Sequence, residues 1–148
     1  MDISKTCLEI LDLIALNNQL DLKTILCDFS KSNFQFFNRN SRKIVYSSYS
    51  LHYIHDFSLS FIEKLLDTGF VGGIHLEPCY EFMRNLKNQT YRNICLNYMI
   101  WNDYNKNIGS VFLEAEKKGL ISINISKKIF GSNFLPAWTI NWRSCRNG

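Results

Sequence analysis

The sequence predicts an α/β protein: a mainly parallel sheet with helices on both faces, closed by an antiparallel pair of strands at its carboxyl-terminal end. Two observations carry this prediction. Short apolar runs of the length of buried strands alternate along the chain with longer segments whose apolar residues recur at helical spacing. The last two strand-like segments, residues 120–131 and 137–144, follow each other without a helical segment between them, so we expect them to pair antiparallel.

The first half of the chain predicts two helices and two strands. The first helix follows Ser4, which we expect to cap it, and its apolar residues Leu8, Leu11, Ile14 and Leu16 have helical spacing. A buried strand over LKTILCDF and an irregular stretch come next. The second strand is KIVYSSYSL, and the second helix, SLSFIEKLLDTG, ends at Gly69.

The second half predicts a third strand, a long helical region and the two terminal strands. The third strand, VGGIHLEP, is ended by Pro78. Helical sequence then extends to about residue 119, with a break near Asn102 to Asn107. Three buried parallel strands are few for such a sheet, so we expect the missing ones to precede residue 1.

The composition is that of one globular domain. The chain has 148 residues, of which 46% are hydrophobic and 20% charged, which is ordinary for a folded protein and argues against disorder. This length suffices for one core but not comfortably for two, so we expect a single domain over residues 1–148. The aromatic share of 14% indicates a dense core or an interface more than chemistry.

Charge and cysteine content limit the partners and the compartment. The net charge of +4 comes from scattered residues with no basic stripe and no interleaved aromatics, which makes nucleic acid an improbable partner. The five cysteines have no CxxC spacing, the start of the chain lacks a secretory signal, and no apolar run reaches the length of a membrane span. We therefore expect reduced thiols, a cytoplasmic location and no membrane partner.

Four segments, in this order, carry a resemblance to a known family: KIVYSSYSLHYI, GGIHLEPCYE, NDYNKNI and NFLPAWTINW. They resemble the carboxyl-terminal half of class I S-adenosylmethionine-dependent methyltransferases, over roughly residues 5 to 143. The resemblance implies a partial Rossmann-like sheet. In that fold the fourth strand leads into a segment beside the transferable methyl group, a crossover helix follows the fifth strand, and an antiparallel pair of strands closes the sheet.

The most specific motif of that family, a glycine-rich turn after the first strand, is absent from this sequence. The glycine cluster Gly69, Gly72 and Gly73 comes before a strand and not between a strand and a helix, so it cannot cradle the cofactor. We expect it to end a helix and to admit a tight turn. The isolated chain is therefore expected to bind S-adenosylmethionine weakly or not at all, and to need a protein partner or a second copy.

The resemblance places Asp28 and Phe29 against the adenine of the cofactor, because an acidic residue and an apolar neighbour at the end of the third strand often serve this role in the family. The alternative is that Asp28 begins a turn.

Polar residues follow the second predicted strand. Ser47 and Ser48 are expected at the cofactor, Tyr49 at the substrate, and His52 as the group that accepts a proton from the nucleophile. The alternative is that Tyr49 and Tyr53 are packing aromatics and that His52 is a hydrogen-bonded surface histidine.

Alternation along the third strand puts His75 and Glu77 on one face, at the same sheet edge as Ser48 and His52. His75 is then a candidate for contacting the substrate, and Glu77 a catalytic candidate that orients a substrate amine or hydroxyl. A structural role for Glu77, as a cap of the following helix, is as well supported. The histidines and Cys79 lack the spacing of a zinc site, so we expect no metal.

The break in the long helical region supplies the last candidates. Asp103, Tyr104 and Asn105 lie on the substrate side in the resemblance, although a plain helix junction explains them as well.

The function implied by the resemblance is methyl transfer to an unidentified nucleophile. A non-catalytic regulatory or interaction subunit of a methyltransferase, or a truncated gene product, is the alternative.

Overall fold

The computed structural model describes residues 4–28, 31, 34, 37–38, 41–132 and 134–146, except the side chains of residues 127–130. The chain divides into two compact units, Met1–Asn33 and Phe34–Gly148. None of the helices in the described part of the chain is long and apolar enough to cross a membrane.

The first unit contains helix α1 (Lys5–Asn17), which confirms the first predicted helix. The Ser4 hydroxyl caps it by accepting a hydrogen bond from the backbone N–H of Cys7 at 3.3 Å. The strand predicted over residues 22–29 does not form: apart from an isolated bridge at Leu26, the described residues 21–28 are irregular. A short apolar run therefore predicted a strand where no ladder of hydrogen bonds develops.

The second unit is built on a four-stranded sheet in the order β1-β2-β4-β3. The strands are β1 (Lys43–Ser48), β2 (Phe70–Glu77), β3 (Ile121–Gly131) and β4 (Pro136–Ser144). β1 and β2 pair parallel, whereas β4 pairs antiparallel with both β2 and β3. The predicted antiparallel terminal pair is confirmed. The prediction of a mainly parallel sheet is wrong, because the last strand lies between β2 and β3 and makes two antiparallel pairings.

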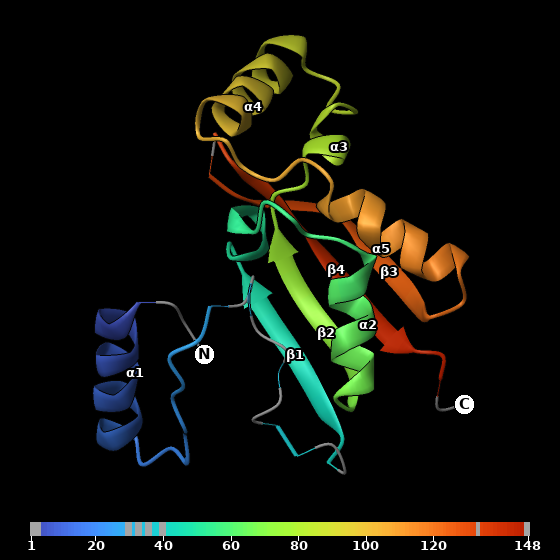
Figure 1. Ribbon diagram of the computed structural model, residues 1–148. Coiled ribbons are helices and arrows are strands. Elements are labelled where there is room, and N and C mark those ends of the chain that lie inside the picture. The colour runs from blue at the N-terminus through green and yellow to red at the C-terminus, as the bar shows by residue number, and fades with distance from the viewer. Residues whose placement is uncertain are drawn as a thin grey trace. The chain divides into compact units, whose positions relative to one another are not determined.

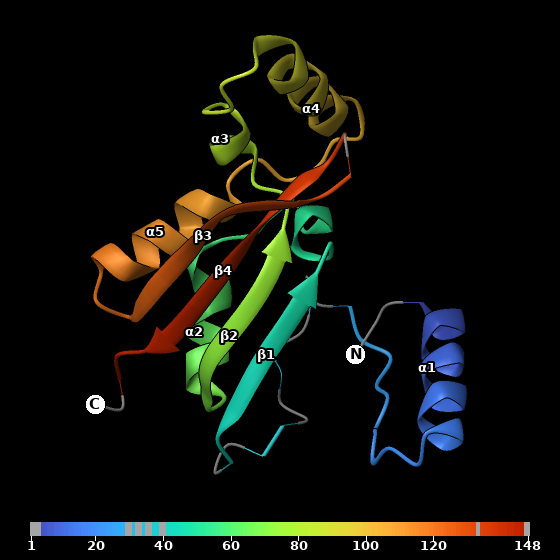
Figure 2. The same cartoon turned by 180° about the vertical axis from the view of Figure 1, so that it is seen from behind.

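Two helices cover one face of this sheet. In Figures 1 and 2, α2 (Leu59–Asp67) and α5 (Ile108–Lys117) lie on the same side of the strands. We call this side the covered face and the opposite side the open face. Figure 2 shows the open face toward the viewer, with no described helix of the second unit in front of it. The prediction of helices on both faces is therefore not met within this unit.

The remaining helices lie beyond the carboxyl ends of β1 and β2 (Figure 1). They are α3 (Tyr80–Met83) and α4 (Gln89–Trp101), and the chain breaks between Asn102 and Asn107 before α5 begins. The predicted order of strand then helix after residue 70 is confirmed, as is the break. Gly69, with φ of +88°, ends α2 as expected.

The core of the second unit lies between the covered face and its two helices. Its fully buried apolar side chains include Phe57, Ile62, Leu65, Ile108, Phe112 and Ile140. All five cysteines are free thiols; Cys27, Cys79 and Cys95 are buried, and Cys7 and Cys145 are exposed. Burial raises the pKa of the Cys79 thiol well above its usual range, with Glu81 and Glu77 adding to the effect, so this thiol is unreactive.

Candidate functional site

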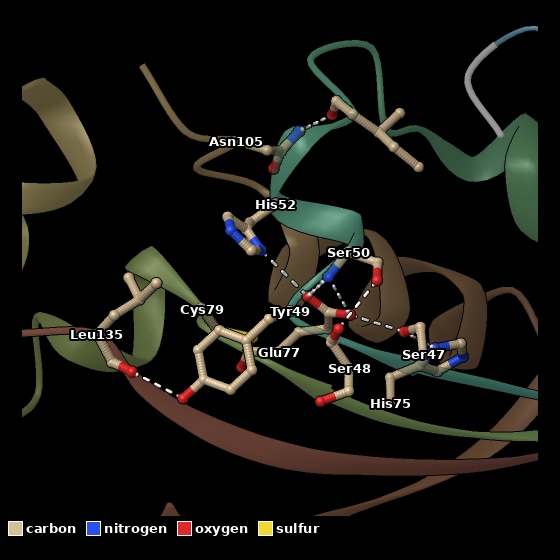
Figure 3. A network of polar contacts seen from close by, with 11 residues as sticks. Ser47, Ser48, Tyr49, Ser50, His52, His75, Glu77, Cys79, Asn105 and Leu135 are labelled. Carbon is tan, nitrogen blue, oxygen red and sulfur yellow. Dashed lines mark hydrogen bonds and ion pairs between the residues drawn. The ribbon is translucent and has the colours of Figure 1, made fainter. Parts of the chain in front are cut away.

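The candidate site lies where the parallel strands β1 and β2 end. Parallel strands bring their carboxyl ends to one sheet edge, so Ser47 near the end of β1 and Glu77 at the end of β2 are neighbours. A short loop and the 3₁₀ turn Leu51–Tyr53 follow β1 and carry His52 over this edge. Figure 3 shows these side chains turned toward the Glu77 carboxylate.

The Glu77 carboxylate is the centre of the cluster, and it has no exposed surface. It accepts hydrogen bonds from the Ser47 hydroxyl at 2.7 Å and from the backbone N–H of Ser50, which lies 3.0 Å from both oxygens. Nδ1 of His52 lies 3.4 Å from Oε2. A buried carboxylate is tolerated only when donors surround it, and three donors from β1 and its loop do so here.

A chain of hydrogen bonds ends at the same carboxylate. The Trp142 indole N–H donates to Nε2 of His75 at 2.9 Å, and because an indole only donates, Nε2 carries no proton. Nδ1 of His75 lies 2.8 Å from the Ser47 oxygen. Since Ser47 gives its own proton to Glu77, His75 must donate to Ser47. The geometry therefore assigns His75 as a neutral imidazole protonated on Nδ1.

Burial supports that assignment. His75 has no exposed surface, and desolvation lowers its pKa from 6.5 to about 4, while the nearby Glu77 acts in the opposite direction. The ring also packs 5.0 Å from Phe112 of α5. Both ring nitrogens are engaged and no surface is open, so we reassign His75 from substrate contact to support of Ser47 and Glu77.

Tyr49 has the left-handed backbone conformation that turns the chain out of β1, with φ of +49°. Its N–H still donates to the carbonyl of Leu76 at 3.0 Å, and its hydroxyl donates to the carbonyl of Leu135 at 2.9 Å. Desolvation by burial raises the pKa of Tyr49. A Cβ at Gly131 would lie 1.8 Å from this hydroxyl, so the glycine makes room for it. Tyr49 is anchored in the fold at both ends.

His52 is buried beneath aromatic rings. Only 1% of its surface is exposed, and its ring centre lies 4.1 Å from that of Tyr53 and 4.5 Å from that of Tyr104. The backbone holds it there, because the N–H of Asn105 donates to the carbonyl of His52 at 2.8 Å. The Asn105 side chain donates in turn to the carbonyl of Ile54 at 2.8 Å (Figure 3). Asn105 thus fastens the turn after β1 to the break before α5.

The rings over His52 continue to the surface. Tyr53 is 61% exposed and lies 5.2 Å from Tyr104, whose ring centre is 6.2 Å from that of Tyr98. Tyr98 stacks with the exposed Phe134. The hydrogen bond with Tyr53, followed by burial, raises the pKa of Tyr104 to about 12, so the Tyr104 phenol stays protonated at neutral pH. A substrate that reaches His52 has to displace Tyr53 or Tyr104.

The structure separates the predicted site residues into two groups. Those that come together are Ser47, Tyr49, His52, His75, Glu77, Tyr104 and Asn105. Ser48 ends β1 on the open face, and its carbonyl accepts from the Ser50 hydroxyl. Asp103 is exposed, with φ of +51°, and lies near His55 and Lys106 at the surface. Both lie outside the cluster.

The two predicted adenine contacts, Asp28 and Phe29, belong to the first unit, whereas the cluster is built from residues of the second. Asp28 belongs to the first unit, where it lies 3.2 Å from the Lys31 ammonium. Phe29 lies outside the described residues.

Sequence reasoning missed two members of the cluster. Ser50 contributes its backbone N–H, which carries no sequence signal. Trp142 reaches His75 because β4 runs antiparallel beside β2, with Trp142 opposite Gly73. The polar residues at the end of β2 gave no indication of this register. In the described part of the chain, no three His, Cys, Asp or Glu side chains come together as metal ligands.

No family model matches the sequence, and no curated protein or solved structure matches it either.

Proposed function

We propose that this chain is the substrate-side half of an S-adenosylmethionine-dependent methyltransferase-like protein, which transfers a methyl group to an unidentified nucleophile once a partner completes the cofactor site. The observation that carries the proposal is the fixed loop at the carboxyl edge of the parallel pair. Glu77, at the end of β2, holds the N–H of Ser50 and so shapes the loop after β1. In the resembling family this loop lies beside the transferable methyl group.

The order of the elements supports the proposal. A parallel pair, a helical crossover and a closing antiparallel pair follow one another as the resemblance implies. The loop chemistry agrees as well, because methyl transfer depends more on aligning the reacting atoms than on acid–base groups. In this scheme Glu77 is a positioning residue that acts through Ser50 and His52, and not a catalytic residue.

The described residues do not make a complete cofactor site. Gly72 and Gly73 lie inside β2, and a Cβ at Gly73 would lie 2.3 Å from the Trp142 indole nitrogen. Close packing of a strand against a ring, and not a phosphate- or cofactor-binding turn, explains Gly73. We expected Gly69, Gly72 and Gly73 to end a helix and admit a tight turn. Only Gly69 lies at a turn, whereas Gly72 and Gly73 lie inside β2. The cofactor's amino-acid end therefore needs a surface that the described residues do not supply.

A non-catalytic role is the second candidate, and the burial of His52 favours it. A proton acceptor has to reach the proton that it removes, and His52 is 1% exposed beneath two tyrosine rings. In this reading the aromatic surface over His52 contacts a complete methyltransferase and regulates it.

Calorimetric titration with S-adenosylmethionine tests the main proposal. We expect no saturable binding to the purified chain alone, and binding after a copurifying protein is added, because half a pocket cannot bury most of a ligand. Tight binding by the isolated chain would show that the missing glycine turn does not matter.

His52→Ala and Tyr53→Ala separate the two candidates. If the chain takes part in methyl transfer, His52→Ala should reduce the transfer of labelled methyl groups by the assembled complex while leaving the complex intact. If the chain only regulates, Tyr53→Ala should weaken assembly and His52→Ala should leave the transfer rate unchanged. Size-exclusion chromatography of the complex reports assembly independently of activity.

A further inference from the structure

The open face of the sheet has an apolar half that no described element of the second unit covers. Its cross-strand rows follow from the pairing: Ile44, Gly72, Arg143 and Ser122 form one row, and Tyr46, Ile74, Asn141 and Asn124 form the next. On β1 and β2 the side chains are apolar and exposed, at 71% for Ile44, 67% for Tyr46 and 45% for Ile74. On β4 and β3 they are polar.

The antiparallel and parallel halves of this face differ in how readily they are exposed to water. An antiparallel sheet commonly leaves one face in water, which suits Asn141, Asn124 and Ser122. All-parallel sheets occur almost only with both faces covered, and β1–β2 is the parallel part of this mixed sheet. The parallel pair β1–β2 has helices on one face and bare apolar side chains on the other, so its open face is a surface that needs a cover.

This surface has both a knob and a hole. Gly72 has no side chain between its row neighbours Ile44 and Arg143, and these residues, together with Ile74 and residues of β3 and β4, line a groove of about 740 Å³ that extends across the sheet. Tyr46 stands beside it, two residues after Ile44 on β1 and opposite Ile74. A projecting ring next to a hollow of this size makes the face complementary to itself, which is what a two-fold interface requires.

The charges around the groove suit an aromatic ring. Arg42 and Arg143 line it, no acidic residue does, and neither arginine has an ion-pair partner among the residues that the structure describes. A guanidinium beside the hole can lie over an inserted ring and make a cation–π contact. Tyr and Arg are also the residue types enriched at the centres of protein interfaces.

We propose that a second copy of this chain covers the open face. The two copies pack the apolar halves of their sheets together about a two-fold axis, and Tyr46 of each copy enters the hollow over Gly72 of the other. The proposal rests on the shape and chemistry of this face and does not depend on the proposed methyl transfer.

Sedimentation equilibrium of the full chain over a range of concentrations tests the proposal. We expect a dimer for the wild type and for Tyr46→Phe, which keeps the ring. Tyr46→Ala should raise the dissociation constant by about tenfold to a hundredfold, as expected for a central anchor residue, and Tyr46→Asp should give monomers. Circular dichroism checks that each variant is folded.

Ile74→Asp and Leu113→Asp form a matched pair that locates the interface. Both side chains are 45% exposed, but Ile74 is on the open face and Leu113 is on α5. Only Ile74→Asp should dissociate the dimer, and this variant also serves if Tyr46→Asp does not fold. A monomeric wild type, a dimer that survives both open-face substitutions, or equal dissociation by Leu113→Asp would overturn the proposal.

Discussion

The two faces of β1 and β2 reverse the usual distribution of polar and apolar side chains. On the covered face, the carboxyl ends of these strands hold the buried His75 and Glu77 and the half-buried Ser47 in one hydrogen-bonded network. On the open face, the same strands expose Ile44 and Tyr46 along with Ile74. Buried polar groups cost free energy unless every donor and acceptor is satisfied, and exposed apolar groups gain nothing until something covers them.

The two faces therefore have different roles: the covered face stabilises the fold, and we propose that the open face mediates association. The network on the covered face fixes one loop conformation, because a half-satisfied version of it would be worse than an apolar core. The exposed side chains of the open face contribute little to the stability of the second unit, and they are where the proposed second copy makes contact. Substitutions on the covered face should therefore change folding, and substitutions on the open face should change association.

Removing the buried carboxylate should have the largest effect. Glu77→Ala leaves the half-buried Ser47 hydroxyl, the Ser50 N–H and the buried His52 without their acceptor. We expect the free energy of unfolding to fall by about 3 kcal/mol, measured by urea denaturation. Glu77→Gln keeps an acceptor oxygen and should cost about half as much. An equal loss in both variants would mean that the network does not depend on the carboxylate.

Alanine substitutions of the adjacent glycines Gly72 and Gly73 compare how closely the two faces of β2 are packed. A Cβ at Gly73 would lie 2.3 Å from the Trp142 indole nitrogen and 2.7 Å from Cγ1 of Val45, so the buried ring would have to move. Gly73→Ala should therefore destabilise the chain by about 2–3 kcal/mol. A Cβ at Gly72 meets only the Trp142 carbonyl oxygen at 3.0 Å, and Gly72→Ala should cost less than about 1 kcal/mol.

Thermal denaturation of the two alanine variants at low protein concentration measures this difference. Dilution keeps any loss of association, which Gly72→Ala would also cause, out of the comparison. If Gly72→Ala were the more destabilising of the two, close packing of Gly73 against Trp142 and Val45 would not be what limits side-chain size on this strand.

The neutral state of His75 predicts a dependence of stability on pH. Its pKa is about 4 in the folded chain and 6.5 when unperturbed, so between these values the unfolded chain binds more protons. The stabilisation is complete above pH 6.5 and is lost as the pH falls toward 4. This group alone should lower the free energy of unfolding by about 2 kcal/mol from pH 7 to pH 5.

The control for this prediction is His75→Gln, which removes the titrating group and leaves His52, His55 and the carboxylates in place. Urea midpoints at pH 7, 6 and 5 should fall more steeply for the wild type than for the variant. Parallel curves would show that His75 does not account for the dependence.

Most elements of the second unit were predictable from the sequence, because periodicity and end signals fix them locally. Gly69 ended a helix as expected, and alternation placed His75 and Glu77 on the same face. The sheet topology was not predictable in this way. The position of β4 between β2 and β3 depends on which strand edges it meets, and no local signal reports that.

The site was predicted in position but not in role. Polar residues at the ends of two parallel strands do converge, as expected for such an edge. The sequence did not reveal that Trp142 and the N–H of Ser50 would saturate His75 and Glu77, which removes both from direct contact with a substrate. Burial and cross-strand register decide the role of a polar residue, and both are properties of the folded chain.

We predict the smallest changes in the free energy of unfolding for threonine substitutions of two neighbouring residues of β1. Val45 lies on the covered face and Ile44 on the open face. Threonine keeps the branched Cβ that suits a strand, so each substitution changes the polarity at its site, and at residue 44 it also removes one methyl group. Val45 is half-buried near Gly73, and a hydroxyl there should cost about 1 kcal/mol. Ile44 is 71% exposed, and Ile44→Thr should change the free energy of unfolding by less than about 0.5 kcal/mol at low protein concentration.

At concentrations where copies associate, Ile44→Thr should also lower the melting temperature, because the side chain is then buried. An effect of Ile44→Thr that is large and independent of concentration would mean that the open face is already covered within a single chain.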